Sequence, residues 1–135
     1  MPTTLAPLLF LFLSSFSTFS QGNDLALGIY ELNRGEFDAA IKQFQPLVTI
    51  GYAPAQYQMA TVYQHGYGVE KNNQKALALF KLAAKQNFTD AQFELALIYS
   101  EGKLTQKNLI KAYQLTRAVA NKGIASAQYN LALMY

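Results

Sequence analysis

The segment HGYGVEKNNQKA, residues 65–76, combines two glycines and the only histidine of the sequence with two lysines. Such residues can serve a phosphate-binding loop or a metal site. A phosphate-binding loop has Gly-Lys-Ser/Thr running from a strand into a helix, whereas here Val69 follows Gly68. A structural zinc ion needs four ligands, but the chain has no cysteine and only Glu70 stands near His65. We therefore expect neither a phosphate nor a metal site here, and no cofactor.

A hydrolase would need a nucleophile and a base. Beyond residue 20 the serines are Ser100 and Ser126, and His65 has no partner in a recognisable motif. We therefore discount both a Ser/His/Asp triad and a Ser-x-x-Lys nucleophile. The sequence favours a protein that is not an enzyme.

These residues belong to a repeat of 36 residues. Residues 55–90 and 91–126 align without a gap and share eleven identical residues, and a third copy spans 127–135. Apolar residues recur at helical spacing within each copy, as in Ala76, Leu79, Phe80 and Ala83. Each copy therefore predicts a pair of helices that buries its apolar sides by stacking on its neighbours. The predicted fold is an all-α solenoid of antiparallel helix pairs.

A shorter unit, residues 22–54, precedes the first full copy. Its segment LNRGEFDAAIKQF, residues 32–44, predicts a tight helix-Gly-helix corner. Proline inside a helix costs about 3 kcal/mol, so we expect the second helix to end or kink near Gln45, just before Pro46. Pro54 suits the first turn of the next helix, where its missing N–H does no harm.

Residues 55–84, AQYQMATVYQHGYGVEKNNQKALALFKLAA, resemble the Sel-like repeat (SLR, Sel-one-like), a tetratricopeptide-related unit. The resemblance covers residues 55–135 and is weaker in the second copy, where Leu104 and Thr105 replace the second glycine and the valine of GYGV. The unit at 22–54 is closer to a tetratricopeptide repeat. The resemblance implies a right-handed α-solenoid whose concave side binds a protein or peptide, with secreted members acting as adaptors or assembly factors. One branch with cysteine pairs is linked to penicillin binding, and this chain lacks cysteine.

Several recurring residues suit structural roles in each repeat. Glycines just after the first helix of a copy favour a left-handed helix end. Asparagines three residues ahead of Lys75 and Lys111 suit helix capping. Tyrosines near the end of the first helix suit packing between helices. These structural residues are Gly66, Gly102, Asn72, Asn108, Tyr63 and Tyr99.

Basic residues also recur one repeat apart, which places them in a stripe along the second helices of the pairs. The simplest interpretation is a solvated outer face. The alternative is weak attraction to an acidic partner or to an anionic envelope surface, which would weaken as salt rises. The pairs are Lys71/Lys107, Lys75/Lys111 and Lys81/Arg117.

Partner contacts are expected on the first helix of each pair, at positions that vary between copies. Val62, Ile98 and Met134 recur one repeat apart and would form either an apolar binding track or simple packing between helices. The tentative protein-binding residues are Gln58, Thr61, Val62, Glu94, Leu97, Ile98 and Met134.

The first twenty residues predict a signal peptide. They carry an apolar run from Leu5 to Leu13, and small polar residues follow up to Ser20. No Lys or Arg precedes the run, so an uncleaved anchor or a misassigned start stays open. We expect a periplasmic or secreted protein with no stable membrane insertion after cleavage. The net charge of +3 is too small and too dispersed to predict a nucleic-acid partner.

The sequence ends on NLALMY, a first helix without its partner. Either the array is truncated, or this helix meets a second chain and the protein forms a homo-oligomer. Taken together, the sequence predicts an exported helical-repeat adaptor or assembly factor of the bacterial envelope. The alternative is an envelope hydrolase or a lactam-binding protein of the Sel-like repeat type.

Overall fold

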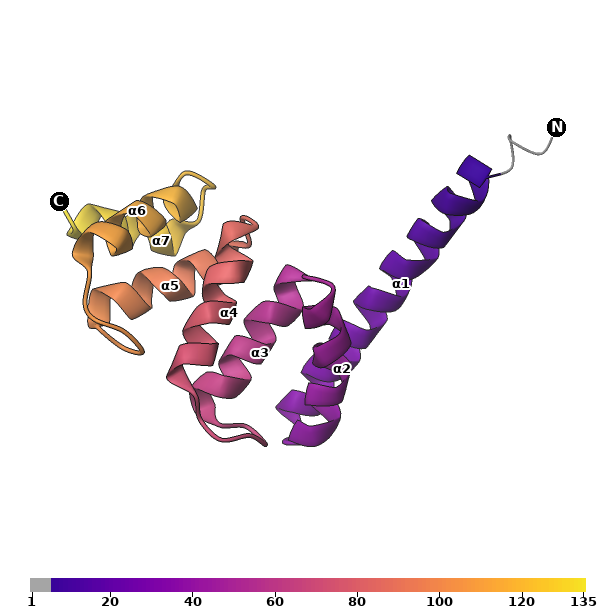
Figure 1. Ribbon diagram of the computed structural model, residues 1–135. Coiled ribbons are helices and arrows are strands. Elements are labelled where there is room, and N and C mark those ends of the chain that lie inside the picture. The colour runs from indigo at the N-terminus through magenta and orange to yellow at the C-terminus, as the bar shows by residue number, and fades with distance from the viewer. Residues whose placement is uncertain (1–5) are drawn as a thin grey trace.

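The computed structural model describes the backbone of residues 6–135 and the side chains of residues 20–135. Within this range the chain forms seven helices and no strand, and successive helices stack along one direction (Figure 1). This arrangement confirms the predicted all-α solenoid. The helices are α1 (Ala6–Asn33), α2 (Phe37–Thr49), α3 (Ala53–His65), α4 (Asn73–Lys85), α5 (Thr89–Glu101), α6 (Leu109–Ala120) and α7 (Ala125–Leu133).

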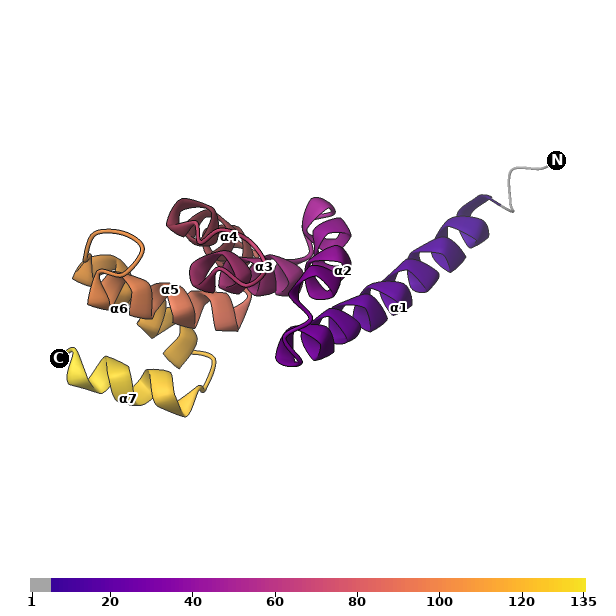
Figure 2. The same ribbon diagram turned by 90° about the horizontal axis from the view of Figure 1, so that it is seen from below.

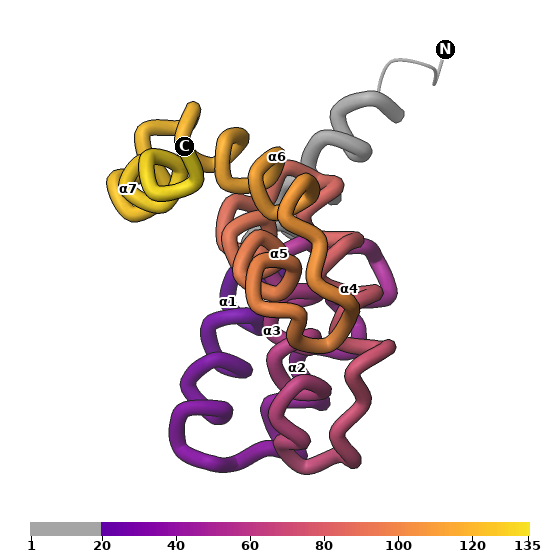
Figure 3. Tube along the Cα trace, turned by 90° about the vertical axis from the view of Figure 1, so that its left-hand side faces the viewer, coloured from indigo at the N-terminus to yellow at the C-terminus, as the bar shows by residue number. Residues whose placement is uncertain are grey.

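The stack has two sides. Figure 2 shows α2 and α4 on one side of the array and α1 and α7 on the other, and the end view of Figure 3 agrees. Each helix packs on its neighbours in the chain, and α1 also touches α3. We call the side formed by α1, α3, α5 and α7 the inner face, and the side formed by α2, α4 and α6 the outer face.

Alanine at fixed places in the repeat lets the helices approach closely. Ala40, Ala76 and Ala112, one repeat apart in the outer helices, are completely buried. The gaps between helix pairs are filled by larger apolar groups, of which Phe44 and Phe80 are also completely buried and lie one repeat apart. The core is therefore a series of equivalent layers, as expected when each unit covers the apolar side of the next.

The two helix ends predicted from glycine have the expected geometry. Gly66 and Gly102 end α3 and α5 with φ values of 70° and 73°, in the left-handed region. Their N–H groups donate to the carbonyl oxygens of Val62 and Ile98, both at 2.9 Å. This closes the last turn of each helix and satisfies carbonyls that the helix itself leaves free.

The two predicted asparagine caps are also confirmed. The side-chain oxygen of Asn72 accepts a hydrogen bond from the backbone N–H of Lys75 at 2.9 Å. Asn108 does the same for Lys111 at 3.0 Å. Each bond satisfies one of the N–H groups at the start of an outer helix, so α4 and α6 begin at equivalent residues of the repeat.

Of the two predicted outcomes near Gln45, an end or a kink of the second helix, the end is wrong. The corner at Gly35 forms as expected, but α2 continues through Pro46 to Thr49. Proline removes the hydrogen bond to the carbonyl of Lys42, and both Lys42 and Pro46 lie on the exposed side of α2, where water can solvate that carbonyl. Helical bonding resumes directly, because the N–H of Ile50 donates to the Pro46 carbonyl at 3.3 Å.

A polar clasp that the sequence analysis did not anticipate links successive helix pairs. The side-chain amide of Gln86, just after α4, donates at 2.8 Å to buried Gln56 in α3 and at 2.8 Å to a carbonyl of the loop before α3. One repeat later, the ammonium of Lys122 donates at 2.7 Å to buried Gln92 and at 3.0 Å to the corresponding loop carbonyl. The clasp therefore recurs with either an amide or an ammonium donor.

The predicted signal peptide is described only in part, because the backbone of residues 6–20 belongs to α1. Residues 1–5 lie outside the described residues altogether, as do the side chains up to residue 19. Among the helices that the structure describes, none combines the length and the apolar character needed to span a bilayer.

Candidate protein-binding groove

A cavity on the inner face lies at the junction of α1 and α3. Its volume is about 610 Å³, within the range of pockets that bind small ligands. Its walls include Ile29 and Leu32 of α1 and Tyr57, Gln58 and Thr61 of α3. Aliphatic, aromatic and amide groups therefore meet in one hollow, which suits an amphipathic segment of a partner.

Two further cavities continue along the inner face. One of 210 Å³ lies between α3, α5 and the turn from α6 into α7, and includes Tyr57, Asp90 and Glu94. Another of 210 Å³ lies between α5 and α7 and includes Leu97 and Met134. The three hollows lie at successive junctions of the stack, and we call them together the inner groove.

Most of the predicted protein-binding residues line this groove, but two do not. Val62 is completely buried and Ile98 is 2% exposed. Both side chains point into the layers between helices, so the interpretation as interhelix packing is right and that of a binding track is wrong for these positions. The predicted residues that do line the inner groove are Gln58, Thr61, Glu94, Leu97 and Met134.

An aromatic series on the inner face was missed by the sequence analysis. Tyr57 and Phe93 lie one repeat apart, and each lines two of the three hollows. Tyr129 stands at the same position in α7 and is 66% exposed. The signal was present as an aromatic residue at the same place in all three copies. Aromatic side chains offer large contact areas, so this series has the residue types that anchor protein partners.

The middle of the groove has a negative character. Burial, followed by the charges of Glu94 and Asp90, raises the pKa of the Tyr57 hydroxyl. Glu94 accepts a long hydrogen bond of 3.5 Å from Gln64. Among the side chains that the structure describes, neither carboxylate has a basic group within 4 Å. The groove can therefore attract a basic side chain next to aromatic surface.

The recurring tyrosines pack between helices, as predicted. Tyr99 is buried and Tyr63 is half-buried. Lys75 and Lys111 place their ammonium groups 5.2 Å from the ring centres of these tyrosines on the outer face. These two lysines are exposed, as the solvated outer face requires, and they also cover the edge of the core.

The loop with the only histidine acts as a packed turn. The His65 ring stacks on Tyr67 with centres 5.2 Å apart, and Tyr67 stacks on Phe37 of α2 at 4.9 Å. Among the described residues, no group of three His, Asp or Glu side chains is placed to hold a metal ion. The loop therefore connects α3 to α4 and touches the preceding unit.

The prediction that the sequence contains no Ser-x-x-Lys arrangement is wrong. Ser100 and Lys103 do have the spacing of a Ser-x-x-Lys motif. However, the Ser100 hydroxyl donates to the Leu97 carbonyl at 2.9 Å, and Lys103 pairs with Glu101 at 2.6 Å in solvent. The hydrogen bond to Glu101 raises the pKa of Lys103, the opposite of what a base needs. This pair lacks the features of an activated nucleophile.

A match to a family model shows the family of this chain. The family model described as "Sel1 repeat" matches residues 53–88, 89–124 and 125–135. The chain belongs to the Sel1 repeat family. The three matched repeats begin where α3, α5 and α7 begin, and the unit that contains α2 precedes them. Sel1 repeats are typically protein-protein interaction modules, and the inner groove is the surface of this Sel1 repeat protein that suits such a role.

Two solved structures support the Sel1 repeat fold. A Sel1 repeat protein from Oxalobacter formigenes matches with a TM-score of 0.73 and 29% identity, over 79% of this chain and 44% of that one. The protein c5321, a protective antigen present in uropathogenic Escherichia coli strains that displays an SLR fold, matches with a TM-score of 0.73 and 28% identity, over 85% of this chain and 26% of that one. This chain thus spans less than half the length of either structure. Among curated proteins, none matches the sequence.

Proposed function

We propose that this Sel1 repeat protein is an exported adaptor or assembly factor of the bacterial envelope that holds a segment of a partner protein in its inner groove. The observation that carries the proposal is the row of three hollows at successive helix junctions. Their walls combine recurring aromatic rings with residues that differ from repeat to repeat. The recurring rings provide contact area, and the variable residues provide the means to select one partner.

The chemistry of the groove favours a partner segment with apolar and basic side chains. Tyr57 and Phe93 offer apolar surface on either side of the middle hollow, where Asp90 and Glu94 lie. A lysine or arginine in this hollow would gain both ion pairing and contact with aromatic rings. Binding should therefore weaken as salt rises.

The inner groove is tested by capture of partners from an envelope extract with Leu97→Ser as the binding variant. Leu97 lines the groove and is only half-buried, so the fold should tolerate the change. The matched control is Leu82→Ser, because Leu82 is a 50% exposed leucine of the outer helix α4. We expect Leu97→Ser to lose the partner and Leu82→Ser to keep it. Equal capture by both variants would refute the inner groove as the binding surface.

Export rests on the pattern of residues 1–20 and is tested separately. The full-length chain is expressed in a bacterial host and recovered from periplasmic and cytoplasmic fractions. We expect the periplasmic form to begin near residue 21, as measured by the mass of the intact protein. Recovery of uncleaved protein from the cytoplasm alone would contradict export, but it would leave the proposal of a binding surface in the inner groove unaffected.

We further propose that the protein acts without catalysis. The alternative of a lactam-binding or hydrolytic protein is tested with a chromogenic lactam. Steady hydrolysis that is abolished by Ser100→Ala would contradict our proposal, since Ser100 belongs to the Ser-x-x-Lys spacing described above. We expect no turnover by the parent protein above that of buffer.

Self-association is a second candidate interaction, favoured by exposed apolar side chains on α6 and α7. Leu109, Ile110 and Leu133 are 58%, 73% and 68% exposed. Burial of such side chains against a second copy would be favourable. Sedimentation velocity at increasing concentration tests this, with Ile110→Ser as the variant. A strict monomer at every concentration would contradict self-association.

A further inference from the structure

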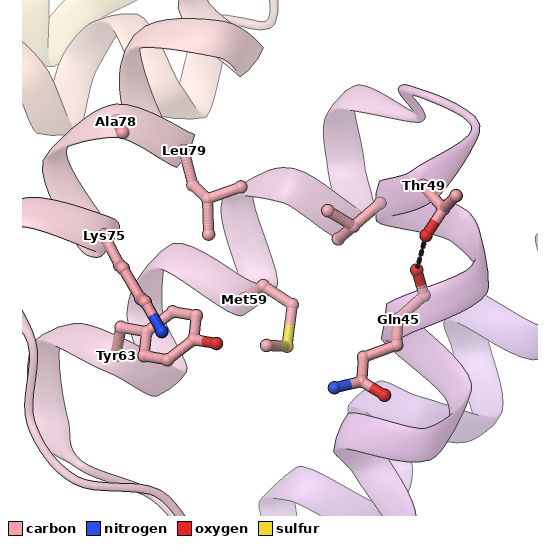
Figure 4. Close-up of a pocket in the computed structure, with 8 residues that line it drawn as sticks. Gln45, Thr49, Met59, Tyr63, Lys75, Ala78 and Leu79 are labelled. Carbon is pink, nitrogen blue, oxygen red and sulfur yellow. Dashed lines mark hydrogen bonds between the residues drawn. The ribbon is translucent and has the colours of Figure 1, made fainter.

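A separate cavity opens on the outer face, away from the inner groove. It has a volume of 460 Å³ and lies between α2, α3 and α4, at the junction of the first two helix pairs (Figure 4). Met59 of α3 projects into it, and Val48 and Leu79 contribute apolar surface from α2 and α4. Its size and mainly apolar lining are those of pockets that bind small molecules.

A single cationic group stands at one side of this cavity. Figure 4 shows Lys75 and Tyr63 on one side of Met59 and Gln45 on the other. The Lys75 ammonium lies 5.2 Å from the centre of the Tyr63 ring. Within the described part of the chain, no carboxylate lies within 4 Å of this ammonium. The cavity therefore places an uncompensated positive charge next to apolar surface.

The repeat itself does not require this opening. One repeat later, Lys85 stands in place of Thr49 and Gln114 in place of Ala78, while the smaller Ala84 stands in place of Val48. The longer side chains belong to the second junction, whereas the shorter Thr49 and Ala78 line the cavity at the first. The lysine is common to both junctions, since Lys111 corresponds to Lys75. The small residues thus distinguish the first junction, and the second supplies natural controls.

We propose that this outer cavity binds a small amphipathic carboxylate. The carboxylate would pair with the Lys75 ammonium, and an unbranched apolar chain would lie against Met59, Val48 and Leu79. The carboxylate suits this cavity because its lining includes the Lys75 ammonium and no acidic side chain. The apolar chain suits Met59, Val48 and Leu79 because none of these side chains needs a hydrogen-bond partner. This ligand site is independent of the proposed inner groove.

The probe is sodium decanoate, used below the concentration at which it forms micelles. The chain contains three methionines, so labelling with ¹³C-methyl methionine gives a simple spectrum. Met59 projects into the outer cavity, whereas Met134 lies in the inner groove between α5 and α7. We expect a saturable shift of the Met59 methyl signal and no shift at Met134. Equal shifts at both would indicate general adsorption and would overturn the proposal.

Two matched variants test the assignment of the charge and of the space. Lys75→Met should weaken decanoate binding about tenfold, the scale of a lost charge-assisted hydrogen bond. Lys111→Met removes the equivalent lysine from the next repeat and should leave the affinity unchanged. Ala78→Gln, which copies the residue found at position 114, should fill the opening and weaken binding without disturbing the fold.

A neutral probe completes the test. Decanol has the same chain without the charge, and it should bind at least tenfold more weakly than decanoate. Equal affinity for decanol and decanoate, or equal loss of binding in Lys75→Met and Lys111→Met, would overturn the carboxylate site. Decanoate would contact three helices of two units in the folded protein only. It should therefore also raise the melting temperature of the parent protein but not of Ala78→Gln.

Discussion

At the residue scale, the loop residues 65–76 set the geometry of the repeat. Gly66 ends α3, Asn72 begins α4, and the Asn72 N–H donates to the Tyr63 carbonyl at 2.9 Å. The same three contacts recur 36 residues later, with Gly102, Asn108 and Tyr99. Residues with phosphate or metal chemistry in other settings therefore serve here to fix two helix ends.

The first prediction concerns the left-handed glycines. Gly66→Ala should lower the free energy of unfolding by about 1–3 kcal/mol, because alanine is strained at positive φ. Its Cβ would also come within 3.3 Å of the Lys71 backbone nitrogen. Gly123→Ala is the control, since Gly123 has a φ of 83° but open space around it. In urea unfolding, the loss of unfolding free energy in Gly66→Ala should be at least as large as that in Gly123→Ala. A Gly66→Ala protein that is more stable than the parent would contradict the assigned helix end.

The second prediction concerns the asparagine caps. Asn72→Ala should cost about 1 kcal/mol, because the N–H of Lys75 loses its acceptor. The control is Asn73→Ala at the neighbouring position, which is exposed and gains helix propensity from alanine. Urea denaturation that shows the same stability for both variants would refute the cap.

At the element scale, the helices follow from the sequence and some of their limits do not. The apolar spacing of residues such as Ala76, Leu79 and Phe80 predicts α4, because one buried face at helical period has no equivalent in a strand. The end of α2 at Pro46 was predicted wrongly, because the cost of proline in a helix depends on whether water solvates the carbonyl that it leaves unbonded, here that of Lys42. The clasp through Gln86 and Lys122 escaped prediction because it joins residues thirty positions apart and uses two residue types.

The third prediction concerns this clasp. Lys122→Met should cost about 1–3 kcal/mol, because the buried amide of Gln92 loses its hydrogen-bond donor. Lys122→Gln is the control, since glutamine at position 86 makes the equivalent bonds in the preceding repeat. Hydrogen exchange should show the loss first in α6 and α7, as neighbouring units stabilise one another. Equal protection in Lys122→Met and Lys122→Gln would contradict the role of the clasp.

At the scale of the whole molecule, stacking decides which variable residues reach a partner. The sequence groups Val62 and Leu97 alike as variable apolar residues of the first helices. The structure buries Val62 in a layer, whereas Leu97 lines the inner groove. The repeat period fixes which residues are equivalent, but the rotation of each helix about its axis decides which side faces the groove. This rotation arises from packing between units and cannot be inferred from one copy.

The outer and inner faces consequently offer different chemistry. The inner groove combines aromatic rings with the carboxylates of Asp90 and Glu94, whereas the outer face carries lysines that include Lys75 and Lys111. A protein segment on the inner face and an amphipathic carboxylate on the outer face would therefore not compete for the same residues.

The most direct test of the central claim is site-specific photo-crosslinking in an envelope extract. A photoreactive phenylalanine analogue replaces Leu97 in the inner groove or, as the control, Leu82 on the outer helix α4. We predict a covalent adduct with one partner protein from position 97 and none from position 82. An adduct from position 82, with none from position 97, would contradict the assignment of the inner groove as the binding surface.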